Sequence, residues 1–225
     1  MQVLVSGGPA SGVAWLARRW VDDVTGTENT YQRRDGESHA HVVGFYDKEA
    51  HLGDFVRNFL APGLLAGEAA IVVATESHRE LFGQALIEAG IDLRETLRRG
   101  QFIVLDASEA LSKFMVECMP DPARFRAVIG ELISRAAESS RDVRIYGEMV
   151  AVLWDEGNVA AAIALEDLWN DIAASHSFSL YCAYPIHSVV ADATAEAFRK
   201  ICGQHSRLAL VRSRWPGPVA SGKRR

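Results

Sequence analysis

Hydrophobic positions divide the chain between about residues 39 and 206 into alternating strand-like and helix-like segments. Short uninterrupted apolar runs predict strands at 41–46, 69–74, 101–105, 143–146, 179–184 and 208–211. Apolar residues that recur every three or four positions predict helices at 48–60, 77–89, 108–118, 122–139, 158–175 and 189–202. Continuous apolar strands that alternate with helices are typical of a parallel sheet covered on both faces. The pattern therefore predicts an α/β fold with three layers, α/β/α, around a mostly parallel central sheet.

Capping and turn-forming residues mark the ends of these helices. Ser77 begins a capping-box sequence, and Asn158 is a favoured N-cap residue. Pro122 suits the first turn of a helix, where its missing N–H needs no partner. Pro62 and Gly63 predict the end of the first helix. These signals agree with the boundaries that the hydrophobic pattern gives.

The segments on either side of the predicted domain have a different character. Residues 25–38 are polar and aperiodic, which is typical of a linker, so we divide the chain into 1–38, 39–206 and 207–225. The last of these segments holds six basic residues and no acidic residue, and it contains proline and glycine after Trp215. We expect a basic tail that is disordered after Trp215 and is either simply solvated or contacts a partner.

Composition and charge narrow the classes of function. With 48% hydrophobic and 24% charged residues, the 225-residue chain is typical of a globular protein, and its net charge of -5 provides no general attraction to nucleic acid or anionic lipid. No apolar stretch is long enough to span a membrane, and Arg18 and Arg19 follow the N-terminal apolar residues, whereas a secretory signal has them first. Three cysteines without metal-type spacing predict reduced thiols. We therefore expect a cytoplasmic protein without membrane or direct nucleic-acid contact.

The residues that follow the predicted strands are the first candidates for a site, because open α/β sheets bind ligands at the carboxyl ends of their strands. The strands deliver Tyr46, Glu76, His78, Glu148 and Tyr184 to this edge. Glu148 stands between an apolar strand and a second apolar segment, so its carboxylate should lie near or inside the core and need a partner or a proton. Two interpretations stay open for it: ligand contact or proton transfer, and a structural carboxylate.

Two further motifs are incomplete. The stretch from Gly7 has the glycine spacing of a phosphate-binding loop, but Val13 and Ala14 occupy the Lys and Ser/Thr positions. His39 and His41 form an H-x-H pair, yet no third ligand follows at a convincing spacing. The sequence therefore predicts no metal and no cofactor. It leaves His41 as either a hydrogen-bonding residue of the crevice or a structural one.

Several motifs, in a fixed order, resemble the MEDS domain, a sensory domain named from methanogens and a methylotroph dichloromethane-response regulator. They are H-x-x-x-F-Y at 41–46, L-x-x-G-E at 64–68, A-T-x-x-H at 74–78, Y-G-E-M-V with L-W and G-N at 146–158, and C-A-Y-P at 182–185. The match extends from about His39 to Ser188, which is two thirds of the chain.

This resemblance implies a RecA- or KaiC-like core that has lost its phosphate loop and senses a small organic ligand in bacterial signalling. Its motifs imply ligand-binding residues at His41, Tyr46, Glu68, His78, Glu148, Trp154 and Tyr184. Related proteins often carry a kinase or DNA-binding module, which the segments outside the match are too short to supply. We therefore expect the signal to pass to a protein partner, such as a kinase or transcription regulator, or through a homodimer.

Three hypotheses about function remain. The first is a non-catalytic cytoplasmic sensor whose ligand is held by His41, Tyr46, Glu148 and Tyr184. The second is a RecA/KaiC-type nucleotide-binding protein or ATPase in which Glu148 is the general base, although the missing Lys and Ser/Thr argue against it. The third is an interaction protein without a ligand. We favour the sensor.

Overall fold

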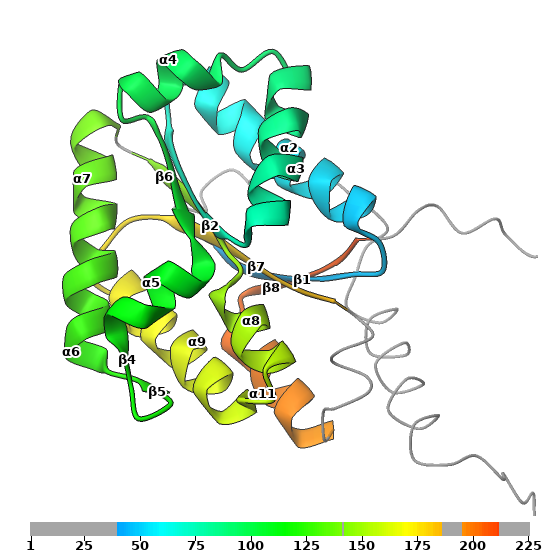
Figure 1. Ribbon diagram of the computed structural model, residues 1–225, viewed down its shortest axis with the longest axis vertical. Coiled ribbons are helices and arrows are strands. Elements are labelled where there is room, and N and C mark those ends of the chain that lie inside the picture. The colour runs from blue at the N-terminus through cyan, green and yellow to red at the C-terminus, as the bar shows by residue number, and fades with distance from the viewer. Residues whose placement is uncertain (1–39, 141, 186–194, 212–225) are drawn as a thin grey trace, which may run out of the picture.

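A computed structural model describes residues 40–140, 142–185 and 195–211, which are coloured in Figure 1. In this part of the chain, six parallel strands form one sheet in the order β3-β2-β6-β7-β1-β8. The strands are β1 (His41–Tyr46), β2 (Ala69–Ala74), β3 (Phe102–Asp106), β6 (Val143–Gly147), β7 (Ser179–Pro185) and β8 (Arg207–Val211). All six predicted strands are confirmed, with ends that differ by no more than one residue.

Helices cover both faces of this sheet (Figure 1). One face carries α2 (Glu49–Leu65), α3 (Glu76–Glu88) and α4 (Leu93–Arg98). The other face carries α5 (Ala107–Phe114), α6 (Pro122–Phe125), the π-helical segment η1 (Arg126–Gly130), α7 (Glu131–Ser139), α8 (Met149–Asp155), α9 (Val159–Ala173) and α11 (Ala195–Gln204). The predicted three-layer α/β/α fold is thus confirmed. Its RecA- or KaiC-like character stays an expectation.

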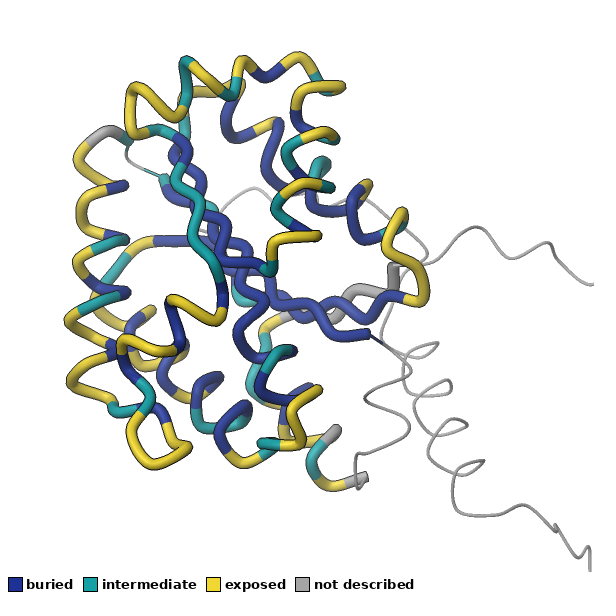
Figure 2. The backbone as a smooth tube through the Cα atoms, viewed as in Figure 1, coloured by how far each residue is buried: buried dark blue, intermediate teal, exposed yellow. Residues whose placement is uncertain are grey.

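Two hydrophobic cores lie on opposite sides of the sheet, because successive strand residues point to opposite faces. In β2, Ile71 and Val73 pack toward the layer of α5 to α9, whereas Ala70 and Val72 pack beneath α2 and α3. The central strands are therefore buried on both sides, as Figure 2 shows. This double burial is the reason that the strands are continuous apolar runs in the sequence.

Some helix boundaries differ from the prediction. α2 does not end at Pro62 but continues to Leu65, because its last turn buries Ala61 and Leu64 against the sheet and a proline removes only one helical N–H. α3 begins at Glu76 with Thr75 as its N-cap residue, so the prediction of Ser77 was wrong by two positions. The predicted helix at 158–175 is confirmed as α9, with the side chain of Asn158 accepting the Ala161 N–H at 3.2 Å.

Two other segments are more divided than the hydrophobic pattern predicts. The helix expected to reach residue 118 stops at Phe114, and a short hairpin follows, β4 (Met115–Val116) and β5 (Met119–Pro120). The helix predicted at 122–139 consists of α6, η1 and α7 in succession. α4 and α8 were not predicted at all. Several predicted features lie outside the described residues: the glycine-rich stretch from Gly7, His39, the linker, residues 189–194 of the last predicted helix and the tail after residue 211.

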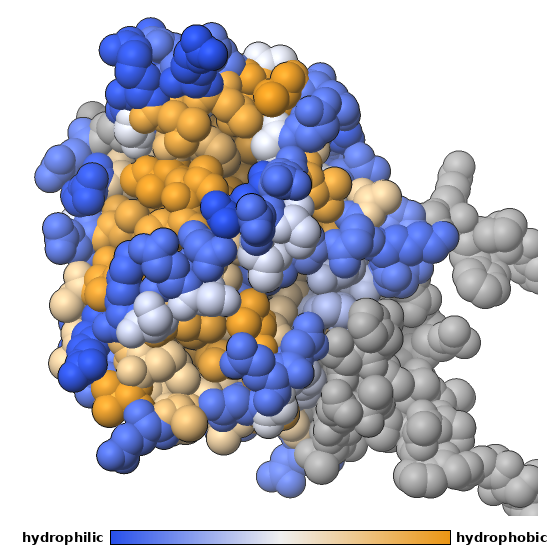
Figure 3. Space-filling view, viewed as in Figure 1, coloured by the Kyte–Doolittle hydropathy of each residue, from blue (hydrophilic) through white to orange (hydrophobic). Residues whose placement is uncertain are grey.

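β3 forms one edge of the sheet and is less buried than the central strands. Four of its five residues are only partly buried, among them Ile103, Val104 and Leu105. Figure 3 shows hydrophobic side chains gathered over this side of the molecule, between α4 and α7. An exposed apolar edge of this kind is suited to contact with another chain. None of the described helices combines the length and apolarity that crossing a membrane requires.

Gly44 allows the closest approach between β1 and a neighbouring side chain. A Cβ atom at this position would lie 1.8 Å from the Oη atom of Tyr181, which is fully buried. We expect Gly44→Ala to lower the free energy of unfolding by about 2 kcal/mol, since the core must shift to admit the methyl group. Gly203→Ala is the control, because a Cβ atom there meets no atom within 4 Å. Equal urea midpoints for the two variants would contradict this packing.

Candidate functional site at the carboxyl edge of the sheet

Glu148 follows β6 directly and is anchored to the end of the adjacent strand β2. Its Oε2 accepts the backbone N–H of Thr75 at 2.9 Å, and the Thr75 hydroxyl lies 3.3 Å from both carboxylate oxygens. Parallel neighbours end at the same edge, which is why residues so distant in sequence meet here. Only 6% of Glu148 is exposed, as its apolar sequence surroundings predict.

His78 lies in the first turn of α3 and is held between two carboxylates. Its Nδ1 is 2.5 Å from Oε1 of Glu148, and its Nε2 contacts Oε2 of Glu49, the first residue of α2. The two carboxylates differ sharply in environment, since the Glu148 side chain is 8% exposed and that of Glu49 is 62% exposed. His78 therefore pairs with a buried carboxylate, Glu148, through Nδ1 and with a surface carboxylate, Glu49, through Nε2.

The surroundings of His78 favour its charged form. Burial by itself would lower the pKa of the imidazole, but the hydrogen bonds and negative charges of Glu148 and Glu49 outweigh burial and raise it. Both ring nitrogens then carry protons and both donate. The Tyr46 ring stands edge-on to His78 with the centroids 6.2 Å apart, and burial, reinforced by the same two carboxylates, raises the pKa of Tyr46. Tyr46 is therefore a neutral phenol beside an imidazolium.

This raised pKa predicts a pH dependence of stability. His78 binds its proton more tightly in the folded than in the unfolded protein, so its contribution is complete below the unfolded pKa of about 6.5 and is lost as the pH rises through the folded pKa. We expect the free energy of unfolding of the wild type to fall relative to that of His78→Gln as the pH is raised from 6 toward 9, about the window in which histidine pKa values lie. Urea titrations across this range measure the difference. A constant difference would contradict a protonated His78.

An aromatic layer extends from His78 into the core beneath α2. His78 stacks on Phe82 at 5.6 Å, Phe82 meets Tyr146 at 4.8 Å, and the Tyr146 and Tyr181 rings lie 5.9 Å apart, all between centroids. The hydroxyl groups of Tyr146 and Tyr181 are buried and have no hydrogen-bond partner among the described residues. Buried polar groups are normally satisfied, so these phenols mark a place where a polar partner would stabilise the protein.

The structure divides the ligand-binding residues predicted from the sequence into separate groups. Tyr46, Glu76, His78 and Glu148 lie at the carboxyl edge, and Glu76 is exposed as the first residue of α3. Their position at one edge agrees with the prediction, whereas their role in ligand binding stays a prediction.

The other four predicted residues are not part of this group, although Tyr184 does lie at the carboxyl end of β7, as predicted. His41 begins β1 and so lies at the amino end of the sheet, which corrects its placement in the crevice. Glu68 precedes β2 at that same end and binds Arg144, with 2.6 Å between Oε2 and Nε. Trp154 and Tyr184 are fully buried in the core under α8 and α9.

Several residues of interest were missed from the sequence. Glu49 is an ordinary acidic residue in the first turn of a helix, and nothing in the sequence distinguishes it. Glu166, fully buried in α9, had a weak signal, because it lies on the apolar side of the helix with Ala162 and Trp169, which are three to four positions away and also buried. His205 had none, since its position next to His41 arises only from the fold.

A hollow of about 390 Å³ lies away from this group, between α7 and the turn before β7. Its lining includes Ile133, Ser134, Glu138 and His176. The turn before β7 leads into the amino end of that strand, so this hollow and the group around His78 are at different ends of the sheet.

Comparison with known proteins assigns the family. The family model described as MEDS, the MEthanogen/methylotroph, DcmR Sensory domain, matches residues 40–200. No curated protein matches. A solved structure described as a structural study of project PH0250 from Pyrococcus horikoshii OT3 aligns with a TM-score of 0.48 and 5% identity, over 77% of this chain and 82% of that one. The family match covers well over half of the chain and includes both the His78 group and His41. The protein therefore belongs to the MEDS family, whose general role is sensory and regulatory.

Proposed function

We propose that this protein is a non-catalytic sensor in which a small organic molecule with a hydrogen-bond acceptor oxygen binds to protonated His78. The observation that carries the proposal is the unequal pair of carboxylates around the imidazole. Glu148 is buried and bound to Thr75, whereas Glu49 is mostly exposed and reaches the outer ring nitrogen. A ligand oxygen can replace Glu49 and leave the buried pair intact.

The replacement of Glu49 gives the binding event a structural consequence. Glu49 is the first residue of α2, so its contact with His78 connects the start of α2 to the start of α3. A ligand that accepts the hydrogen bond from Nε2 of His78 favours an open state, in which the contact between Glu49 and His78 is broken. Because the ligand then binds the open state better than the closed state, it shifts the population between them, which is the requirement for a signal.

The aromatic layer supports a proposal for the class of ligand. The rings of Tyr46 and Phe82 flank His78, and the unpartnered hydroxyl groups of Tyr146 and Tyr181 lie deeper beneath α2. These groups suit a compact molecule with an apolar body and one or two oxygen atoms, such as a short alcohol, carbonyl compound or carboxylate. Strong polarity throughout the ligand would conflict with the apolar surroundings.

The output of the proposed sensor is the exposed edge of β3. Arg79, next to His78 on α3, binds Asp106 at the end of β3, with 3.0 Å between Nη2 and Oδ2. A movement of α3 is therefore passed to the edge strand through this ion pair. We place the contact with a second copy of the chain or with a signalling partner at this partly exposed, apolar edge.

Nuclear magnetic resonance of the histidine side chains tests the proposal. Acetate, acetone and ethanol serve as carboxylate, carbonyl and hydroxyl probes, and ADP tests the nucleotide-binding alternative. We expect one organic probe to shift the His78 ring resonances saturably and to raise the melting temperature, with both effects lost in His78→Gln. His51→Gln is a matched control, because His51 pairs with Asp47 at 2.7 Å and is not part of the group. Saturable binding of ADP with no organic response would contradict the sensor and favour the nucleotide-binding hypothesis.

A further inference from the structure

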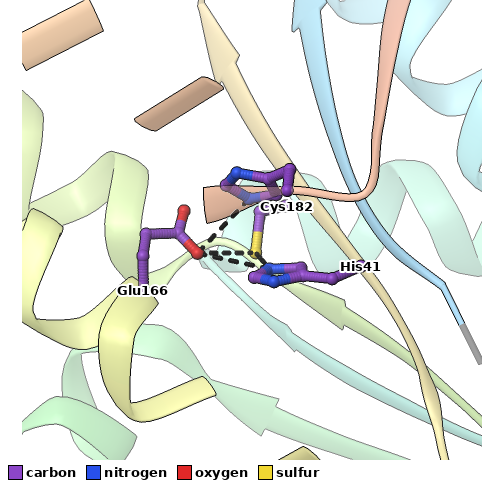
Figure 4. A group of neighbouring side chains, drawn as sticks. His41, Glu166 and Cys182 are labelled. Atoms are coloured by element: carbon purple, nitrogen blue, oxygen red, sulfur yellow. Dashed lines mark hydrogen bonds and ion pairs between the residues drawn. The ribbon is translucent and has the colours of Figure 1, made fainter. Parts of the chain in front are cut away.

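A second group of chemically active side chains lies on the opposite face of the sheet. It consists of His41 in β1, Cys182 in β7, Glu166 in α9 and His205 just after α11, with one potential ligand atom of each residue within 4.8 Å of the others. Figure 4 shows the carboxylate of Glu166 directed at the ring of His41 and the sulfur of Cys182. The Glu166 and His205 side chains are fully buried, and the His41 side chain is 10% exposed.

Hydrogen bonds at Nδ1 hold the rings of His41 and His205 so that Nε2 of each ring faces the group. The Nδ1 of His205 is 2.7 Å from the carbonyl oxygen of Ile201, so it carries a proton and donates. The Nδ1 of His41 is 3.0 Å from Oδ1 of Asn170, and the orientation of that amide is set because its Nδ2 donates to the Gln204 carbonyl. In both neutral rings the lone pair is then on Nε2. Partners of this kind orient histidines that bind metals.

The Glu166 carboxylate cannot satisfy these lone pairs, and among the described residues only the Nε2 of His41 has a donor within reach, the Cys182 thiol at 3.6 Å. The Nε2 atoms of His41 and His205 are 3.3 and 3.4 Å from the same oxygen of Glu166, and a carboxylate oxygen cannot donate a hydrogen bond. The buried Nε2 of His205 has no hydrogen-bond partner among the described residues. The other oxygen of Glu166 is occupied, since it accepts the hydroxyl of Tyr184 at 2.8 Å. A cation between these atoms would satisfy all of them together.

All six distances among the four atoms are within 4.8 Å, and four of them are close to those around such a cation. Tetrahedral zinc has bonds of about 2.0–2.3 Å to nitrogen, oxygen and sulfur, which places neighbouring ligand atoms about 3.3–3.6 Å apart. The two nitrogen-to-oxygen distances of 3.3 and 3.4 Å agree with this spacing. Sγ of Cys182 lies 3.6 Å from Nε2 of His41 and 3.8 Å from Oε2 of Glu166.

We infer that His41, Glu166, Cys182 and His205 bind one transition-metal ion of the zinc class through two imidazoles, a carboxylate and a thiolate. Four protein ligands close the coordination sphere, so the site is structural and does not activate a substrate. It joins β1, β7 and α9 to the segment that leads into the edge strand β8. Metal occupancy therefore controls how firmly this side of the sheet is held. The inference is independent of the proposed ligand at His78.

Cobalt is the most informative probe of the site. The full chain is reduced, stripped with a chelator and titrated with Co²⁺ alone. We expect one equivalent to bind with the visible absorption of tetrahedral cobalt and with a thiolate-to-cobalt charge-transfer band. Cys182→Ser should lose the charge-transfer band, whereas Cys118→Ser should keep it, because Cys118 is exposed and remote from the group. Retention of the band in Cys182→Ser would overturn the ligand assignment.

Zinc added to the stripped wild type gives a second readout that requires no variant to fold. At about a hundredfold excess over the dissociation constant, we expect the melting temperature to rise by about 5–10 °C. The rise should be absent in His205→Ala. If that variant does not fold, addition of a chelator to the zinc-loaded wild type should reverse the rise. A melting temperature unchanged by zinc, with no cobalt binding, would overturn the inference. The group would then be an ion triad of Glu166 with two protonated histidines, visible as imidazolium signals in nitrogen resonance spectra.

Discussion

Glu166→Ala should lower the free energy of unfolding by about 4 kcal/mol, the largest effect of a single substitution that we expect. The fully buried carboxylate lies within 3.4 Å of the Nε2 atoms of His41 and His205 and accepts the Tyr184 hydroxyl. In the metal-free group, burial raises the pKa of the Glu166 carboxyl, but the charges of His205 and His41 and the hydrogen bonds from their protonated rings outweigh burial and lower it well below its usual range. Removing one partner of a buried charged group leaves the others uncompensated, which typically costs about 3–5 kcal/mol.

This expectation holds with and without a metal ion in the group, because the histidines and Tyr184 lose their shared partner in both cases. Equilibrium unfolding in urea measures the effect. Glu156→Ala is the comparison, since Glu156 is an exposed carboxylate beyond the end of α8, where a substitution changes stability by about 0.5 kcal/mol or less. Similar losses in the two variants would show that Glu166 is not the centre of the buried group.

Replacement of Glu148 should have the second largest effect, and its two variants separate structure from sensing. Glu148→Ala removes the acceptor of the Thr75 N–H and of the His78 Nδ1–H together, so we expect a loss of about 3 kcal/mol. Glu148→Gln retains an acceptor oxygen and should lose only about 1 kcal/mol. Because it also removes the charge that keeps His78 protonated, it should abolish the response to the organic probe.

Thermal unfolding of both variants, measured with and without the probe that binds the wild type, checks this pair of effects. Glu80→Ala serves as the control, because Glu80 is an exposed carboxylate on the same helix as His78. If Glu148→Gln were destabilised as strongly as Glu148→Ala, or kept the full response to the probe, Glu148 would be a structural residue only.

Much of the fold is predictable because burial on two sides leaves a direct trace in the sequence. β2 and β7 are buried along their whole length and are plain apolar runs. The errors arose where packing outweighs local preference. Burial of its last turn carries α2 past Pro62, and the segment predicted as one helix at 122–139 contains a π-helical turn at 126–130. Local propensity alone does not contain this information.

Residues of the candidate sites were predictable only where a charged side chain stands among apolar neighbours in the sequence. Glu148 is a carboxylate between apolar segments, and it is buried as expected. Glu49 is a common residue in the first turn of a helix, so its contact with His78 left no trace. The group around Glu166 depends on the strand order, which places β1 between β7 and β8 and so brings His41 to Cys182 and His205. No spacing rule along the chain detects such an arrangement.

The central claim is that His78 binds a small organic molecule. Native mass spectrometry of the freshly purified full chain tests this claim most directly. The account predicts a stoichiometric organic adduct on the wild type that is absent from His78→Gln and retained by His51→Gln. A metal adduct would be distinguished by its mass and by its loss from Cys182→Ser with no change in His78→Gln. An organic adduct that His78→Gln retains in full, or an adenine nucleotide in its place, would contradict the account.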